Sequence, residues 1–403
     1  MKVPWQAWYG DMEENLSFPA GWQVTLASMA DAPELGDRAV DHALRNPIGT
    51  PPLKELAKGV SNAAIVVEDI TRPSPTAQIL AKILAQLEDG GLDRERVRII
   101  VGTGAHTTMH RSELLKKLGP GVLEGVEVFQ HQPYENLVCL GETQRGTPIH
   151  INRVFLDADL RIGVGSITPH AYAGFGGGAK IVAVGLAGMD TLHANHAREM
   201  AGEAGGVGCV EGNQCRADLE EIAEVAGLTF VVNCVVNSRR QLAGLFAGDM
   251  IRSHRAAVEF ARNVYATQIP SPADIGVFNA YPKDTDLVQS INAFNVVRFE
   301  LDRAVRQGGS VVMTTACPEG AGIHLLEGPG MRGFVAYDQD QHLGGYGIII
   351  YSPNLSYPEV RQIYPASTLV FNRWHEVTEE LTKRHGHSAS VSVFPCASLQ
   401  IPA

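Results

Sequence analysis

Short apolar runs alternate with amphipathic segments along most of this chain, and this alternation limits the fold more than any other feature. Residues 63–69 (AAIVVED) have the β-branched content of a buried strand. Residues 75–91 carry leucine and isoleucine on one helical face and end at a Gly-Gly stop. Residues 97–106 predict a second strand that runs into a glycine-rich turn. Strands that alternate with helices form parallel sheets covered on both faces, so we predict an α/β fold.

The same alternation restarts after Pro270. Residues 273–280 predict a strand, and the apolar periodicity of residues 286–309 predicts one long helix ended by two glycines. A chain of 403 residues exceeds one ordinary hydrophobic core. We therefore predict two α/β domains with mainly parallel sheets, residues 1–268 and 269–403, with the active site in the cleft between them. The topology allows the last residues to return to the first domain.

Charge and cysteine content limit the partners and the compartment. The net charge is −11, with 33 Lys and Arg against 44 Asp and Glu. Nucleic acid and anionic membranes both select clustered basic residues, so neither is an expected partner. No apolar run is long enough for a membrane span, and the N-terminus lacks the apolar core of a signal peptide. The six cysteines are scattered without a C-x-x-C pair, which indicates reduced thiols and a cytoplasmic protein.

Polar side chains follow three of the predicted strands at the point where each strand ends. In open α/β sheets, ligands bind beyond the carboxyl ends of the strands. One such group alone is most simply explained as turn chemistry, but three groups in one domain favour a shared site. The groups are Asp69, Thr71 and Arg72, then Thr103 and His106, and then His170, Tyr172 and Lys180.

Each of these side chains has a structural and a functional interpretation. Arg72 could tie down its loop by pairing with Asp69, or it could receive a carboxylate or phosphate with its planar guanidinium. His106 could cap a helix, or it could act as an acid or base near neutral pH. His170 follows Pro169, whose ring restrains the loop, although a single histidine is more often structural than catalytic.

The glycine-rich stretch GFGGGAK at residues 174–180 matches no common nucleotide motif. A Walker loop needs Gly-Lys followed by Ser or Thr, and no complete G-x-G-x-x-G stands near a strand end. A glycine-rich turn that opens a helix can still hold a phosphate through its N–H groups. Downstream, His193 and His196 are three residues apart on one helical face, as surface residues or as metal ligands.

Four of these stretches, taken in order and spacing, resemble the nickel-dependent lactate racemase family. They are DITRPSP (69–75), GTGAH (102–106), ITPHAYAGFGGGAK (167–180) and HANH (193–196). The resemblance covers most of the chain and is strongest between Asp69 and His196. It implies a nickel pincer nucleotide as cofactor, which is a pyridinium-3,5-bisthiocarboxylic acid mononucleotide carrying nickel.

The resemblance also assigns roles to individual residues. His196 would bind the nickel, and Lys180 would be the lysine that can be tethered to the cofactor. His106 and His170 would be the paired acid/base groups, and Arg72 would bind the substrate carboxylate. The cofactor site would contain Asp69, Thr71, Arg72, Tyr172, Gly176, Gly177 and Lys180. The first domain would bind this cofactor, and the second, Rossmann-like domain would close over the substrate.

The implied activity is racemisation or epimerisation of a small 2-hydroxy acid by proton-coupled hydride transfer to the cofactor, which dedicated enzymes synthesise. In the lactate enzymes a Gln and a Lys, three residues apart, bind the substrate from the second domain. Here Gln289 is followed by Asn292 where the Lys is expected. The loss of this charge predicts a monocarboxylic substrate longer than lactate. Two alternatives are a metal-dependent hydrolase or lyase that uses His106, His170 and His196, and a nucleotide-binding regulator.

Overall fold

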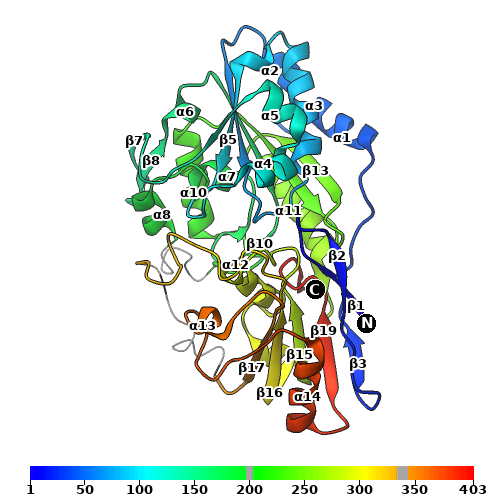
Figure 1. Ribbon diagram of the computed structural model, residues 1–403. Coiled ribbons are helices and arrows are strands. Elements are labelled where there is room, and N and C mark those ends of the chain that lie inside the picture. The colour runs from blue at the N-terminus through cyan, green and yellow to red at the C-terminus, as the bar shows by residue number, and fades with distance from the viewer. Residues whose placement is uncertain (197–201, 203, 333, 335–343) are drawn as a thin grey trace. The chain divides into compact units, whose positions relative to one another are not determined.

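The computed structural model describes residues 1–196, 202, 204–332, 334 and 344–403, which form two compact units. The terminal unit consists of Met1–Asp31 and Arg262–Ala403, and the central unit consists of Ala32–Ala261. Each unit contains a six-stranded sheet, and parallel pairing dominates in both (Figure 1). The predicted α/β class with two mainly parallel sheets is therefore confirmed. None of the helices in these residues is long and apolar enough to span a membrane.

The sheet of the central unit has the strand order β13-β12-β9-β4-β5-β6, and only β13 is antiparallel to its neighbour. The strands are β4 (Ala63–Glu68), β5 (Val97–Gly102), β6 (Glu127–Gln130), β9 (Leu160–Ser166), β12 (Phe230–Val236) and β13 (Leu242–Gly248). All residues of β4 and β12 are buried, which explains why these strands are continuously apolar rather than alternating.

Helices pack around this sheet (Figure 1), and the unit also contains two antiparallel strand pairs, here called ribbons. The helices are α1 (Asp37–Arg45), α2 (Leu53–Leu56), α3 (Thr76–Asp89), α4 (Arg111–Leu118), α5 (Pro120–Gly125), α6 (Arg153–Leu156), α7 (Lys180–Ala183), α8 (Met189–Asn195), α10 (Gln214–Val225) and α11 (Arg252–Tyr265), with a 3-10 turn at Arg94–Arg96. The ribbons pair β7 (Leu137–Glu142) with β8 (Pro148–Asn152), and β10 (Pro169–His170) with β11 (Gly174–Phe175).

The sheet of the terminal unit is entirely parallel, in the order β18-β17-β16-β15-β19-β3. Its strands are β3 (Gln23–Leu26), β15 (Ala273–Asn279), β16 (Val305–Thr314), β17 (Gly347–Tyr351), β18 (Leu369–Phe371) and β19 (Ser390–Phe394). Val311 and Met313 pack into one core and Val312 packs into another, so both faces of the sheet are buried. The helices are α12 (Leu287–Ser290), α13 (Tyr357–Val360) and α14 (Trp374–His385).

The division of the chain differs from the predicted boundary at residues 268 and 269. The first 31 residues belong with the C-terminal segment, because β3 pairs in parallel with β19 at the edge of the terminal sheet. The hairpin of β1 (Lys2–Trp5) and β2 (Met12–Asn15) belongs to the same unit. The last strand, β20 (Ile401–Pro402), pairs with β14 (Ala266–Thr267) and so remains in the terminal unit.

The predicted helix over residues 286–309 is wrong. Only α12 is α-helical, and it is followed by 3-10 turns at Ile291–Val297 and Leu301–Arg303. Arg298 and Phe299 have φ values of 51° and 64°, which end the helical path. The chain then enters β16, where Val305 pairs with Ala273. Apolar spacing of three to four residues does not distinguish an α-helix from a 3-10 helix. The last residues of the predicted helix form a strand instead, because they pair with β15, which lies earlier in the sequence.

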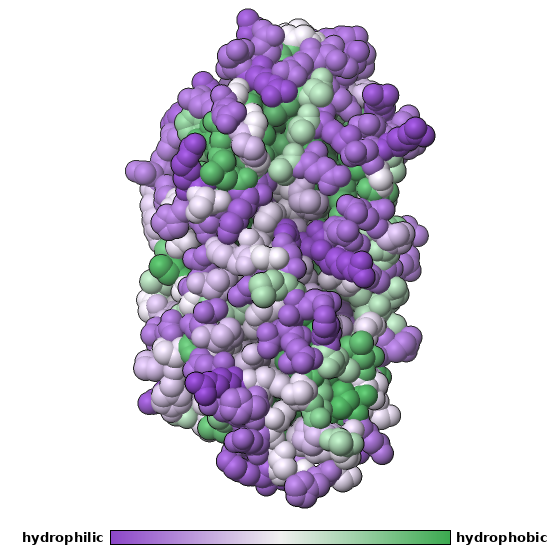
Figure 2. Space-filling view, turned by 45° about the vertical axis from the view of Figure 1, so that its right-hand side comes forward, coloured by the Kyte–Doolittle hydropathy of each residue, from purple (hydrophilic) through white to green (hydrophobic). Residues whose placement is uncertain are grey.

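Apolar side chains on the surface are dispersed. Tyr134 and Ile323 are the most exposed large apolar residues described, at 65% and 64%, and they lie in different units. Figure 2 shows a face on which hydrophilic residues dominate and apolar residues form small separate groups.

Candidate active site

The order of the central sheet defines where a ligand site can form. The chain moves from β4 to β5 and β6 on one side, and then to β9, β12 and β13 on the other. The strand order therefore reverses at β4, and crevices at such switch points open beyond the carboxyl ends of the strands. The loops that follow β4, β5 and β9 carry Asp69, His106 and His170, and these three strands are neighbours.

Asp69 and His106 form the closest contact between these loops. The Nδ1 atom of His106 lies 2.6 Å from Oδ2 of Asp69, and the Asp69 side chain is 3% exposed. Thr71 donates to Oδ1 of the same carboxylate from its backbone nitrogen at 2.8 Å and from its hydroxyl at 2.5 Å. The predicted meeting of the first two strand ends is confirmed by this contact.

The carboxylate of Asp69 is held in its charged form. Burial alone would raise its pKa, but His106, the nearby Arg72 and the hydrogen bond from Thr71 outweigh burial and hold the pKa well below its usual value. An ionised carboxylate only accepts, so Nδ1 of His106 donates to it. In the neutral ring of His106, Nε2 is then the basic nitrogen.

His170 has the opposite arrangement. The backbone N–H groups of Tyr172 and Ala173 donate to its Nδ1 atom, at 3.3 and 3.1 Å. Nδ1 is therefore unprotonated, and Nε2 carries the proton of the neutral ring. The two predicted acid/base histidines thus have complementary tautomers, one with a basic Nε2 and one with an acidic Nε2–H.

His196 connects these groups in space. Its ring centroid lies 5.7 Å from that of His170 and 5.8 Å from that of Tyr172. Burial, together with the charges of Lys180, His106 and Arg72, lowers its pKa to about 3. Its Nδ1 atom is buried and has no hydrogen-bond partner among the described residues. A neutral imidazole with an unsatisfied buried nitrogen is the form of histidine that binds metal ions.

Lys180 opens α7 directly after the glycine-rich segment. Burial, Arg72 and Arg216 together lower its pKa to about 7. Arg72 donates to the Thr71 hydroxyl at 2.8 Å. Arg72 and Lys180 both lower the pKa of His196, so positive charge gathers around this imidazole. Such a site favours an anionic ligand.

Gly176 and Gly177 were predicted to let the backbone approach a cofactor, and the structure gives a second reason for them. A Cβ atom on Gly176 would lie 2.8 Å from the carbonyl oxygen of Ser166. A Cβ atom on Gly177, whose φ is +69°, would lie 2.6 Å from Ile167. Both positions therefore require glycine because of contacts within the protein. Their approach to a ligand remains a prediction.

Gln289 and Asn292 lie in the terminal unit, at α12 and the 3-10 turn after it. Asn292 donates to the carbonyl oxygen of Gln289 at 2.8 Å and accepts from Nζ of the buried Lys283 at 3.1 Å. An ammonium group therefore lies beside Asn292. The charge that appeared lost at this position is present on another residue, which removes the argument against dicarboxylic substrates.

Some polar residues that support the site were not predicted. Lys117, from α4, is fully buried and donates to the carbonyl oxygens of Arg72 and Ser74 at 2.8 and 3.2 Å and to the Ser74 hydroxyl at 2.9 Å. Burial lowers the pKa of Lys117 to about 8. The Ser74 hydroxyl donates in turn to Glu68 at 2.9 Å, and Glu68 accepts from Ser166. This chain ties the loop after β4 to β9.

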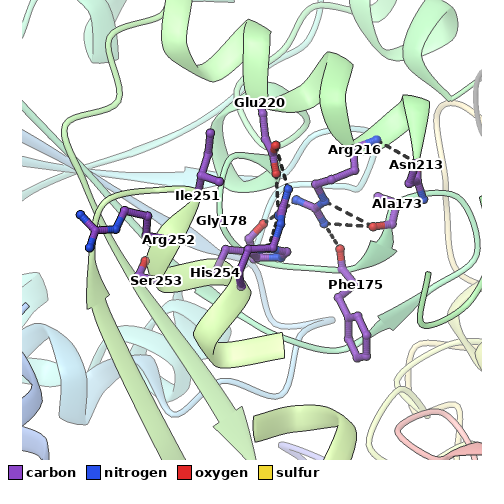
Figure 3. A network of polar contacts seen from close by, with 12 residues as sticks. Ala173, Phe175, Gly178, Asn213, Arg216, Glu220, Ile251, Arg252, Ser253 and His254 are labelled. Atoms are coloured by element: carbon purple, nitrogen blue, oxygen red, sulfur yellow. Dashed lines mark hydrogen bonds and ion pairs between the residues drawn. The ribbon is translucent and has the colours of Figure 1, made fainter. Parts of the chain in front are cut away.

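Arg216 and His254 contact backbone carbonyl oxygens of residues 173–177, in and next to the glycine-rich stretch (Figure 3). Arg216 is 1% exposed and donates to carbonyl oxygens of that segment, and His254 contacts the carbonyl oxygen of Gly176 at 3.0 Å. One signal for Arg216 exists in the sequence. It lies three residues before Leu219 on the apolar stripe of α10, where a charge must have buried partners.

These features define an α/β protein with two complementary histidines, a metal-competent histidine and a lysine of lowered pKa at one sheet edge. The comparisons with known proteins agree with this class. The sequence profile of the lactate racemase N-terminal domain matches residues 9–207. Lactate racemases from Thermoanaerobacterium thermosaccharolyticum and Lactiplantibacillus plantarum are each 31% identical, over 288 and 287 residues. The chain belongs to the lactate racemase family.

The alignments to these two relatives cover 70% of this chain and 66% of each relative. The fold extends further than the sequence similarity. The lactate racemase apoprotein of T. thermosaccharolyticum has a TM-score of 0.78 at 24% identity and covers 100% of this chain. A crystal structure of a Thermotoga maritima protein has a TM-score of 0.68 at 17% identity and covers 92%.

Proposed function

We propose that this protein is a racemase or epimerase of a 2-hydroxy acid. The observation that carries the proposal is the pair of complementary tautomers at His106 and His170. The ring of His170 contacts that of His196, and the charge of His106 lowers the pKa of His196. Inversion through a keto acid requires the hydroxyl proton to leave one enantiomer and a proton to return to the oxygen when the other enantiomer forms. The relatives named lactate racemase support the same reaction class.

The proposal gives each side chain a role. Arg72 supplies a planar guanidinium for the substrate carboxylate, which fixes the orientation of the acid. Nε2 of His106 accepts the hydroxyl proton, and the ionised Asp69 stabilises the imidazolium that forms. Nε2–H of His170 donates a proton to the carbonyl oxygen when the opposite enantiomer forms. The two histidines exchange these roles in the reverse direction.

The residues present fit the nickel pincer nucleotide of the family. The buried Nδ1 of His196 lacks a protein partner, and its imidazole is neutral, as a nickel ligand must be. Lys180, whose pKa is lowered to about 7, would lie beside the nucleotide, and near neutral pH its amine would have a neutral, nucleophilic form. When bound, the nucleotide would supply an acceptor for the α-hydrogen as hydride, which an acid/base pair alone cannot accept.

The alternative of a metal-dependent hydrolase or lyase at His106, His170 and His196 receives no specific support. Within the described ranges, no group of three or more His, Cys, Asp or Glu residues is placed to hold a metal ion. A site of that kind would need further protein ligands, such as the three that are typical of catalytic zinc.

The test is a panel of single-enantiomer 2-hydroxy acids on cofactor-loaded protein: lactate, 2-hydroxybutyrate and malate. We expect loss of optical purity for at least one acid. His106→Gln and His170→Gln should each lower kcat by about 10²–10⁴-fold and leave bound nickel unchanged. His193→Gln is the matched control and should keep full activity. Failure of loaded protein to racemise any acid, or full activity in either variant, would contradict the proposal.

A further inference from the structure

Arg216 is buried beside the site without a carboxylate partner. No ion pair joins it to an acid in the parts of the chain that the structure describes. Glu220, whose charge favours the charged form of Arg216, is itself paired with Arg255 at 2.7 Å. Burial of an unpaired guanidinium is costly, and it lowers the pKa of Arg216 to about 10. Such a cost indicates a specific task for this charge.

The guanidinium instead donates hydrogen bonds to the backbone of residues 173–177, in and next to the glycine-rich stretch (Figure 3). Its Nε and Nη2 atoms donate to the carbonyl oxygen of Ala173 at 3.3 and 3.2 Å, and Nη2 also donates to that of Phe175. Its Nη1 atom donates to the carbonyl oxygen of Gly177 at 3.3 Å. One rigid, planar group therefore fixes three peptide groups, which an ammonium group could not span.

Neighbouring side chains fix the rest of the segment. Arg255 can only donate, and its contact with Nδ1 of His254 at 3.0 Å makes that nitrogen the acceptor. Nε2–H of His254 therefore donates to the carbonyl oxygen of Gly176. The N–H of Gly178 donates to Asn233 at 2.7 Å. Four carbonyls and one N–H of a segment that contains four glycines are thus held by side chains.

Ala173 links Arg216 to the candidate active site. The carbonyl oxygen of Ala173 accepts from Arg216, and the N–H of Ala173 donates to Nδ1 of His170 at 3.1 Å. With the N–H of Tyr172, this N–H makes Nδ1 of His170 an acceptor and so defines its tautomer. At the other end, the segment leads directly into Lys180.

We propose that Arg216 is a positioning residue that holds residues 173–178 in the conformation that orients His170 and fixes its tautomer. The inference rests on the proposed function for its effect on turnover, but its effect on the segment is independent of that function. Arg216 does not contact the reacting atoms and acts through the peptide of Ala173.

Arg161 offers a matched control in the same unit. It also donates to three carbonyl oxygens, those of Ala158, Ala226 and Leu156, at 3.0, 3.0 and 2.5 Å. It lies near the start of β9, at the end of this strand that is opposite to His170. Arg161→Met should therefore cost stability without an effect on the site.

The first experiment is hydrogen exchange of the apoprotein, which needs no cofactor. Arg216→Met should speed the exchange of amides in residues 168–180 at least tenfold, and Arg161→Met should leave that peptide unchanged. Equal exchange of this peptide in the two variants would overturn the inference. If loaded wild-type protein fails to racemise any acid, the proposed function fails, and the exchange result still decides the inference.

The second experiment separates positioning from a loss of stability. In loaded protein, Arg216→Met should lower kcat about 10²-fold and change KM less than threefold, because a small misplacement of an acid/base group affects chemistry first. Arg216→Lys should recover only a small part of the kcat that Arg216→Met loses. For Arg216→Ala, ethylguanidinium should restore kcat at least tenfold and neutral ethylurea should not. Wild-type kcat in Arg216→Met, or absence of guanidinium rescue, would refute the role.

Discussion

Removal of the charge of Arg72 should raise the pKa of Lys180 part of the way back to its usual value. With a pKa of about 7, Lys180 is half neutral at pH 7. A free lysine of pKa ~10.4 is neutral in roughly one molecule in 2,500 at that pH. After burial, Arg72 is the largest cause of this shift. Loss of a like charge at short range raises a lysine pKa by about one unit or more, so Arg72→Gln should reduce the neutral fraction at pH 7 from half to about one tenth.

The assay is the pH dependence of amine modification in the apoprotein, read by mass spectrometry of the peptide that contains Lys180. The midpoint should lie near pH 7 in the wild type and near pH ~8 in Arg72→Gln. Lys54, whose side chain is 50% exposed, serves as the internal reference. A Lys180 midpoint that coincides with that of Lys54, or one that Arg72→Gln leaves unchanged, would refute the reasoning.

The same shift has a consequence for stability. The folded pKa of Lys180 lies below the unfolded value, so the unfolded chain binds the additional proton between pH ~7 and pH ~10.4. The contribution of Lys180 to the free energy of unfolding therefore rises with pH over this window. Arg72→Gln should raise the lower limit of this pH range, so the free energy of unfolding should increase less between pH 7 and pH 9 than in the wild type. Urea titrations at these two pH values would measure this increase.

Three further predictions concern single side chains. Asp69→Asn should lower kcat about 10²–10⁴-fold with nickel retained, because a neutral amide cannot stabilise the His106 imidazolium; a kcat within threefold of wild type would contradict this. His196→Ala should abolish nickel binding in metal analysis, whereas His193→Ala should retain it; the reverse result would place the ligand one helical turn away. Gly178→Ala should lower the free energy of unfolding by about 1–3 kcal/mol in urea titrations, since φ is +57° and the new Cβ would lie 2.8 Å from the ring of the buried His254; wild-type stability would disprove the clash.

The sequence predicted β4, β5, β6 and β9 of the central sheet, but not β12 and β13, and it predicted the meeting of Asp69 with His106. Both predictions depend on local signals, since apolar runs mark buried strands and polar residues follow the strand ends. The supporting residues Lys117 and Arg216 were missed because their partners are backbone carbonyl oxygens, which any sequence provides at every position. Only the fold determines which carbonyl oxygens face a buried cation.

In the terminal unit, β3 was missed for a related reason. This edge strand has the sequence QVTL, which is short and mostly exposed, so it has no apolar signature. It becomes a strand because β19, more than 350 residues later, offers its free edge. For the charge beside Asn292, the sequence offered Lys283 and Arg298 as candidates that could replace the missing lysine, and the structure places Lys283 there.

The terminal unit is assembled from both ends of the chain, and this fixes an order of events during synthesis. Every residue of the central unit has been translated once residue 261 has left the ribosome, and domains generally fold as units. β3 precedes the central unit in the chain, and its partner β19 follows that unit. The hairpin of β1 and β2 can form locally, but β3 has no partner strand until well after the central unit has been made. A chain that stops before Ser390 should contain a folded acid/base site attached to a terminal unit that cannot complete its sheet.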